Sequence, residues 1–174
     1  MAIEYGHGNL LKQDVDALIN TVNTEGVMGK GIALQFKKAW PAMYADYSAA
    51  ARRGEVVTGR MHVWETGLTT GPRFIINFPT KRHWRAQSRL SDIAAGLKDL
   101  RRVIADHQIT SIALPALGCG NGGLPWTDVE PLIRTELASI DPTVRVVLYP
   151  PSSAREPSLS TSSHVVSDPE HRRD

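Results

Sequence analysis

Lys81 stands among residue types that can turn a lysine into a nucleophile. It closes the stretch NFPTK and is followed closely by Arg82 and Arg85. Like charge and partial burial each lower the pKa of a lysine, and the resulting neutral amine can attack an anomeric carbon or an aldehyde. The same spacing fits a lysine that is solvated in a loop or contacts phosphate, so the residues alone leave both roles open.

The four residues after Lys81 have the composition of a single-stranded nucleic-acid contact. Trp84 offers a ring on which a base can stack, and its neighbours Arg82, His83 and Arg85 can contact phosphates. A tryptophan here can equally be an ordinary surface or core residue. The stretch is therefore a candidate nucleic-acid interface, and the alternative is that Trp84 has no binding role.

The stretch NTVNTEGVMGKGIALQF, residues 20–36, places two asparagines and three glycines between an apolar strand and a helix. Glycine lets the backbone approach a ligand closely, so this first glycine loop is either an elaborate turn or a ligand cradle. It is not a Walker loop, because no glycine lies five residues before Gly29 and Gly31 replaces the magnesium-binding Ser or Thr. Lys30 is therefore expected to be a solvated loop lysine rather than a phosphate clamp.

A second glycine loop is LPALGCGNGGL, residues 114–124, in which Gly118, Gly120 and Gly123 match the spacing G-x-G-x-x-G. That spacing alone is weak evidence for a dinucleotide site, and only one strand is expected after it, so a Rossmann dehydrogenase is disfavoured. Successive backbone N–H groups in such a loop still form a concave anion site that suits a diphosphate.

The elements that must position these loops alternate along the chain. Strands are predicted over 15–20, 61–66, 73–78, 111–115 and 144–149, with a further edge strand over 3–5. Helices are predicted over 32–40 and 42–52. A third is predicted from the apolar residues that recur at helical spacing between Leu90 and Ile104, with Ser91 as its cap. A fourth is predicted to follow a capping box at Thr127 to Glu130. This alternation predicts a three-layer α/β/α domain around a mostly parallel sheet, with both glycine loops at the carboxyl edge where ligands bind.

Composition narrows the class of protein. The 174 residues suggest one domain over 1–150, followed by a polar, Ser- and Pro-rich tail over 151–174 that is expected to be disordered. A net charge of +2 does not by itself indicate nucleic acid. Cys119 is the single cysteine and the six histidines lack metal-ligand spacing, so neither a disulfide nor a metal is expected. We expect a monomer in the cytoplasm with no membrane segment.

The order of motifs G-N-L-L, D-A-L-I-N-T-V-N, G-V-M-G-K-G-I-A, N-F-P-T-K and P-A-L-G-C-G-N-G-G-L resembles a macrodomain, the ADP-ribose-binding fold. The resemblance covers residues 1–150. It is nearest to the DarG-type antitoxin branch, which removes ADP-ribose from DNA bases, and is related to the terminal ADP-ribose protein glycohydrolase. The combination of NTVNxxGVMGKGIALQFK with NFPTKxHWR carries this specificity.

The resemblance implies a bound ADP-ribose and no cofactor. Asn9 replaces the aspartate that usually precedes the adenine, Asn20 closes its strand, Asn23 holds the distal ribose, and the second glycine loop cradles the diphosphate. The implied ligand-binding residues are Asn9, Leu10, Asn20, Asn23, Thr24, Val27, Met28, Gly29, Lys30, Gly31, Ile32, Thr80, Leu117, Gly118, Cys119, Gly120, Asn121, Gly122, Gly123 and Leu124.

The implied reaction is cleavage of the N-glycosidic bond between the distal ribose and a DNA base, with Lys81 and Asn23 as catalytic residues. Whether Lys81 forms an adduct or assists a water stays open. The protein glycohydrolase has an aspartate in the second glycine loop where this chain has Asn121-Gly122-Gly123, which argues against ester substrates. Arg82, His83, Trp84 and Arg85 then become DNA-binding residues. The expected partners are ADP-ribosylated single-stranded DNA and a DNA ADP-ribosyltransferase toxin. A non-catalytic ADP-ribose reader and an ester or O-acetyl-ADP-ribose hydrolase are the alternatives.

Overall fold

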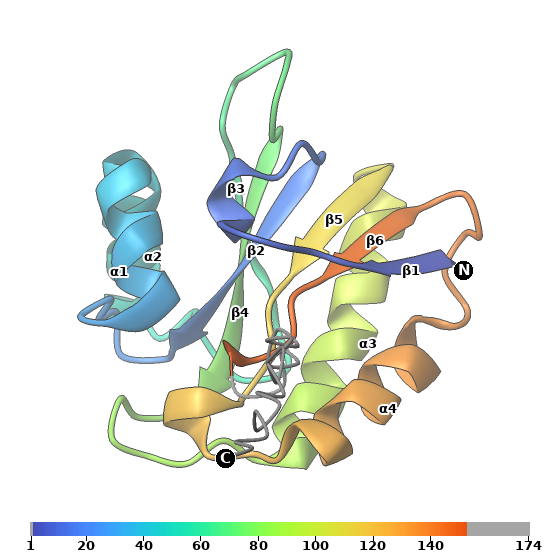
Figure 1. The fold of residues 1–174 in the computed structure, drawn as a ribbon. Helices are drawn as coiled ribbons and strands as arrows, with labels where there is room; N and C mark the ends of the chain where they lie inside the picture. Colours follow the sequence, from blue (N-terminus) through green and yellow to red (C-terminus); the bar gives the residue numbers. More distant parts are fainter. Residues whose placement is uncertain (1, 153–174) are drawn as a thin grey trace, which may run out of the picture.

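The computed structural model describes residues 2–152, and in it a six-stranded sheet lies between two pairs of helices (Figure 1). The strand order is β1-β6-β5-β2-β4-β3, and every neighbouring pair is parallel except β3 and β4. The strands are β1 Ala2–Tyr5, β2 Ala17–Asn23, β3 His62–Glu65, β4 Phe74–Lys81, β5 Ser111–Leu114 and β6 Arg145–Leu148. The three-layer, mostly parallel α/β/α architecture predicted from the sequence is confirmed.

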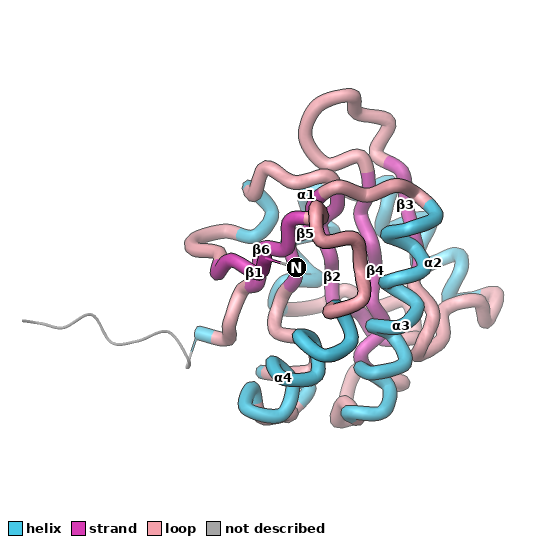
Figure 2. Tube along the Cα trace, turned by 90° about the vertical axis from the view of Figure 1, so that its right-hand side faces the viewer, coloured by secondary structure: helices cyan, strands magenta, loops and turns pink. Residues whose placement is uncertain are grey.

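Successive side chains of the central strands point to opposite faces of the sheet, and this divides the interior into two cores. Ala17 and Ile19 of β2 face the core shared with α3 and α4, whereas Leu18 and Val22 face the core shared with α1 and α2. Both faces of the sheet are therefore covered, which explains why β2 and β4 are buried along almost their whole length. Figure 2 shows these two strands side by side near the middle of the sheet.

The helices begin and end close to the predicted positions, but two predicted caps are wrong. The helices are α1 Gly31–Ala39, α2 Pro41–Arg52, α3 Leu90–Asp106 and α4 Trp126–Leu137. Ser91 and Thr127 both lie inside helices, because the carbonyls of Arg89 and Pro125 already accept the first helical hydrogen bonds. No side-chain cap bond forms at either start.

The predicted end of the strand over 15–20 is also wrong, and this changes the position of a residue predicted to bind the ligand. Asn20 was expected to close the strand, but β2 continues to Asn23 and leaves Asn20 fully buried in its middle. Its side-chain Nδ2 donates to Oδ1 of Asn77, its register partner on β4, at 3.0 Å. Asn20 is therefore a structural residue in the sheet.

The ends of the chain bear on two further predictions. The edge strand predicted over 3–5 forms as β1 beside β6. The predicted tail over 151–174 lies almost entirely outside the described residues. Within the described part of the chain, no helix has the length and apolar character needed to cross a membrane.

Candidate functional site

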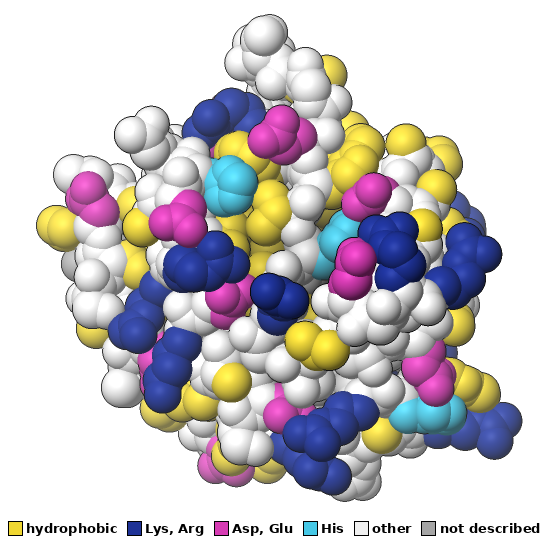
Figure 3. Space-filling model, turned by 180° about the vertical axis from the view of Figure 1, so that it is seen from behind, with side chains coloured by type: hydrophobic (Ala, Val, Ile, Leu, Met, Phe, Trp, Pro, Cys, Tyr) yellow, Lys and Arg dark blue, Asp and Glu magenta, His cyan; other side chains and the backbone are white. Residues whose placement is uncertain are grey.

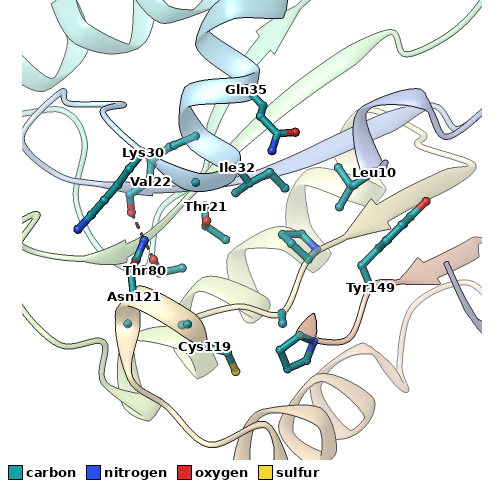
Figure 4. A pocket seen from close by; sticks show the side chains of 18 of the residues that line it. Leu10, Thr21, Val22, Lys30, Ile32, Gln35, Thr80, Cys119, Asn121 and Tyr149 are labelled. Carbon is teal, nitrogen blue, oxygen red and sulfur yellow. Dashed lines mark hydrogen bonds between the residues drawn. The ribbon is translucent and has the colours of Figure 1, made fainter. Parts of the chain in front are cut away.

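A cavity of about 920 Å³ opens at the carboxyl ends of the parallel strands β2, β4, β5 and β6. Both glycine loops line it, together with residues 8–11 and the segment after β6. Figure 4 shows Lys30, Thr80 and Asn121 at one end of this cavity and Leu10 and Tyr149 at the other. The carboxyl edge of a parallel sheet is where ligands bind in open α/β folds, so the topology itself places the site.

A register shift at the end of β2 and β4 brings the two predicted catalytic residues together. Val22 pairs with Pro79, but the next pair is Asn23 with Lys81, so Thr80 is the extra residue of a β-bulge. A bulge re-aims the side chains that follow it. Here it places Asn23 and Lys81 opposite each other, and both line the cavity.

Asn23 uses its carboxamide to fold the chain into the first glycine loop. Its Oδ1 accepts from the backbone N–H groups of Glu25 and Val27 at 3.0 and 3.4 Å, and its Nδ2 donates to the Val27 carbonyl at 2.9 Å. Only an amide can accept and donate in this way, since a carboxylate lacks the donor. Asn23 therefore fixes the loop as well as facing the cavity.

Tyr47 of α2 holds Asn23 in place through hydrogen bonds. Its hydroxyl donates to the Asn23 carbonyl at 2.6 Å and lies 3.2 Å from Asn23 Oδ1. Burial raises the pKa of Tyr47, so the phenol stays protonated and remains a donor. Helix α2 thus holds the strand end that carries Asn23.

Lys81 is half-buried, and its side-chain amine has one hydrogen-bond partner in the described chain, the Trp84 carbonyl, 3.2 Å from Nζ. Burial lowers its pKa first, and the charge of Lys30 lowers it further. The sequence predicted the direction of this shift but assigned the charge to Arg82 and Arg85. Arg82 instead pairs with Asp92 at 3.3 Å, and Arg85 lies over the Trp84 ring. The neighbouring cation that matters is Lys30.

The two glycine loops approach each other across the cavity. Gly118 has a φ of 72°, and a Cβ there would lie 2.7 Å from Leu124 Cδ1, so the second loop requires glycine at this position. Gly31, with a φ of 61°, faces the side-chain nitrogen of Asn121, which would lie 3.7 Å from an added Cβ. Backbone from both loops therefore borders the same space.

The Trp84 segment forms the rim beside Lys81. The Trp84 side chain is 40% exposed, its ring stacks on His83 with centroids 5.7 Å apart, and the Arg85 guanidinium lies 4.3 Å from the ring centroid. Trp84 lines the cavity, whereas the other three predicted DNA-binding residues lie outside it. His83 is 3.3 Å from a carboxylate oxygen of Glu25.

Most of the residues predicted to bind a ligand line this cavity. Those that do are Asn9, Leu10, Asn23, Val27, Gly29, Lys30, Gly31, Ile32, Thr80, Gly118, Cys119, Gly120, Asn121 and Gly122. Six do not. Met28 and Leu117 are buried in the two cores, Asn20 pairs within the sheet, and the Thr24 hydroxyl donates to the Arg82 carbonyl. Gly123 and Leu124 lie beyond the cavity-lining part of their loop.

Sequence reasoning missed a second group of lining residues. Thr21 and Val22 line the cavity because β2 runs past its predicted end, and Gln35 projects from α1. Tyr149, Pro150, Pro151 and Ser152 follow β6. Ligands bind at the carboxyl ends of the strands in open α/β sheets, and applying this to the last predicted strand would have found that segment.

Charge inside the cavity is of one sign. Among the described residues that line it, only Lys30 and Lys81 carry a charge, and no carboxylate does. No group of three potential metal ligands occurs among the described residues. The site is thus built from glycine-rich backbone, amides and two lysines, which suits an anionic ligand.

This fold and site define an α/β domain with an anion-binding cleft at its carboxyl edge. The chain belongs to the macro domain family, whose model matches residues 19–133. It is 56% identical over 150 residues to a DNA ADP-ribosyl glycohydrolase of Mycobacterium tuberculosis, covering 86% of this chain and 42% of that protein. A protein of the same name from Thermus aquaticus is 50% identical, with coverages of 86% and 41%.

Solved structures show the same relationship. The macrodomain of Mycobacterium tuberculosis DarG matches with a TM-score of 0.85 and 56% identity, covering 87% of this chain and 99% of that one. The structure of Thermosipho africanus DarTG in complex with ADP-ribose matches with a TM-score of 0.79 and 32% identity, covering 86% and 42%. The chain spans less than half the length of the two curated relatives from Mycobacterium tuberculosis and Thermus aquaticus.

The support of Asn23 by α2 leads to a prediction for Tyr47→Phe. Loss of the hydroxyl removes a buried hydrogen bond to the Asn23 carbonyl, so we expect unfolding free energy to fall by about 1 kcal/mol. Urea titration measures this change. Tyr44→Phe is the matched control on the same helix, and we expect it to stay within about 0.5 kcal/mol of the parent. Equal effects from both substitutions would contradict the assigned support.

Proposed function

We propose that this chain is a DNA ADP-ribosyl glycohydrolase, which removes ADP-ribose from modified bases of single-stranded DNA. The observation that carries the proposal is the pairing of Lys81 with Asn23 at the cavity mouth, beside the exposed Trp84. The names of relatives at 50% and 56% identity support it.

The cavity offers a place for each part of ADP-ribose. Its volume falls within the range of roughly 300–1,000 Å³ typical of small-molecule sites. We place the diphosphate between the glycine loops, where backbone N–H groups are available, and the distal ribose at Asn23 and Lys81. The adenosine then lies at the Leu10 and Tyr149 end (Figure 4).

We place Asn9 beside the adenine, with part of its amide still available for hydrogen bonds. Its Oδ1 already accepts from the Leu11 backbone N–H at 3.0 Å and caps the short helix Leu10–Lys12. The side-chain NH₂ has no partner among the described residues and is available to a ring nitrogen of the base, while the second lone pair of Oδ1 can accept from an adenine amino group.

The proposed chemistry uses the free amine of Lys81. The amine engages C1″ of the distal ribose as the C1″–N bond to the base breaks, and the departing base takes up a proton. Water then supplies the hydroxyl group at C1″, so the products are ADP-ribose and unmodified DNA. Trapping with cyanoborohydride distinguishes a covalent Lys81 adduct from direct attack by water.

The same site disfavours ester substrates. Acid–base catalysis of ester cleavage is commonly supplied by a carboxylate, and none lines this cavity among the described residues. Trp84 instead offers a ring on which a base can stack next to the scissile bond, with Arg85 above it. Figure 3 shows the molecule from behind the view of Figure 1, with basic and acidic side chains interspersed. We place the DNA at the Trp84 rim because the exposed ring lies there.

We further propose that a DNA ADP-ribosyltransferase supplies the modified DNA. A relative from Thermosipho africanus, 31% identical to this chain, carries the name of a transferase–glycohydrolase fusion protein. The two opposing activities act on the same product, and the expected location of both is the cytoplasm. Co-expression of this chain with such a transferase should lower the amount of ADP-ribosylated DNA in the cells.

Replacement of Lys81 tests the proposed function. We expect Lys81→Ala to lower ADP-ribose release from an ADP-ribosylated oligonucleotide by at least about 100-fold. Lys98→Ala, an exposed lysine on α3, should retain the parent rate. Full activity in Lys81→Ala would refute the lysine mechanism. Tight ADP-ribose binding without release would favour a reader, and preference for ester-linked protein or O-acetyl-ADP-ribose would favour an ester hydrolase.

A pair of glycine substitutions tests where the diphosphate binds. Gly120 and Gly71 both have positive φ and open space around an added Cβ, but only Gly120 lines the cavity. Changing either to Ala should cost about 1–2 kcal/mol of stability through backbone strain. Only Gly120→Ala should also weaken ADP-ribose binding, by about tenfold, in calorimetry. Equal affinities in the two variants would place the diphosphate elsewhere.

Trp84→Ala separates recognition of DNA from recognition of ADP-ribose. Loss of a stacking platform worth about 1–3 kcal/mol should raise KM for the modified oligonucleotide about tenfold. Affinity for free ADP-ribose should stay unchanged, and Trp84→Phe should restore most of the loss. If both affinities fell together, the ring would be part of the ADP-ribose site instead.

A further inference from the structure

The cavity holds two lysines that arrive from different loops. Lys81 ends β4, and Lys30 immediately precedes α1 at the end of the first glycine loop. They are the only charged side chains among the described lining residues. The relatives' names and the lysine chemistry proposed above require only one of them, so the second needs an explanation.

Lys30 is held at the cavity without being neutralised. It occupies the N-cap position of α1 with extended backbone, its side chain makes no capping bond, and no carboxylate pairs with it in the described chain. The next residue, Gly31, faces Asn121 of the second glycine loop, where Figure 4 also shows the Lys30 side chain. Its charge therefore points into the space that both loops border.

Other charges near Lys81 are already paired outside the cavity. Glu25 pairs with His83, Arg82 pairs with Asp92, and Arg85 lies over the Trp84 ring. None of these side chains lines the cavity. Lys30 is thus the one unpaired charge in the described lining that faces the same space as the Lys81 amine.

We propose that Lys30 acts through Lys81, by disfavouring the ammonium form so that the amine is free to engage C1″. Lys30 is a positioning residue in this role and not a catalytic residue. The inference rests on the proposed function only for what the amine then does. Two like charges that face the same cavity favour loss of one proton, and the more buried of the two lysines loses it first.

The charge of Lys30 contributes to the lowered pKa of Lys81, after burial, and this fixes the sign of the effect. Removing the positive charge at position 30 must raise the pKa of Lys81. The fraction of free amine at neutral pH then falls, and the rising limb of the pH–rate profile moves to higher pH. A lysine that only contacts phosphate would change KM and leave that limb in place.

Direct titration of Lys81 is the decisive experiment. NMR of protein labelled with ¹³C at the lysine ε-carbon reports each lysine, and Lys81→Arg identifies the resonance. We expect Lys30→Gln to raise the Lys81 midpoint by about 0.5 pH unit, a modest like-charge effect at a partly solvated site. Lys30→Arg, which keeps the charge, should leave it unchanged, as should Lys38→Gln at the far end of α1.

An unchanged midpoint in Lys30→Gln, or an equal shift in Lys30→Arg, would overturn the inference. In the release assay, the rising limb of Lys30→Gln should move by the same amount and kcat should recover at alkaline pH. The titration uses protein without substrate. An inactive parent protein would therefore refute the proposed function, while the midpoint alone would still decide whether Lys30 controls Lys81.

Discussion

The register shift between β2 and β4 is the constraint on which the site depends. One extra residue, Thr80, sets Asn23 opposite Lys81 at the end of two otherwise regular parallel strands. The same strand ends are held by the Tyr47 hydroxyl from α2 and by the Asn23 carboxamide, which folds the first glycine loop. The first glycine loop, the Asn23 amide and Lys81 are therefore all positioned by this register shift, and a change in any of them alters the positions of the others.

The charges that line the cavity determine which chemistry the site can support. A cavity lined by glycine backbone and two lysines attracts an anionic ligand and leaves one amine with a lowered pKa. An exposed tryptophan, Trp84, lies beside this amine at the rim of the cavity. Under the proposed function, recognition of the diphosphate, activation of the lysine and contact with the base fall to separate groups.

Local patterns predicted the fold and placed both glycine loops at the carboxyl edge, because strand alternation and glycine spacing are local properties. The individual lining residues came from the family resemblance. They did not predict that β2 continues to Asn23, since this extension depends on pairing with β4 and on the buried Asn20–Asn77 contact. No local pattern singles out Tyr47, because its role follows from its contact with Asn23 across the fold. The influence of Lys30 on Lys81 joins residues about fifty positions apart, so adjacent arginines seemed the nearer cause.

The most direct test of this account is a crystal structure of the Lys81→Ala protein bound to an ADP-ribosylated oligonucleotide. The account predicts the diphosphate between the two glycine loops and the base against Trp84. It also predicts C1″ of the distal ribose at the mouth of the cavity, within about 3.5 Å of where the Lys81 amine would reach. A complex with the distal ribose at the Tyr149 end, or with the DNA leaving away from Trp84, would contradict it.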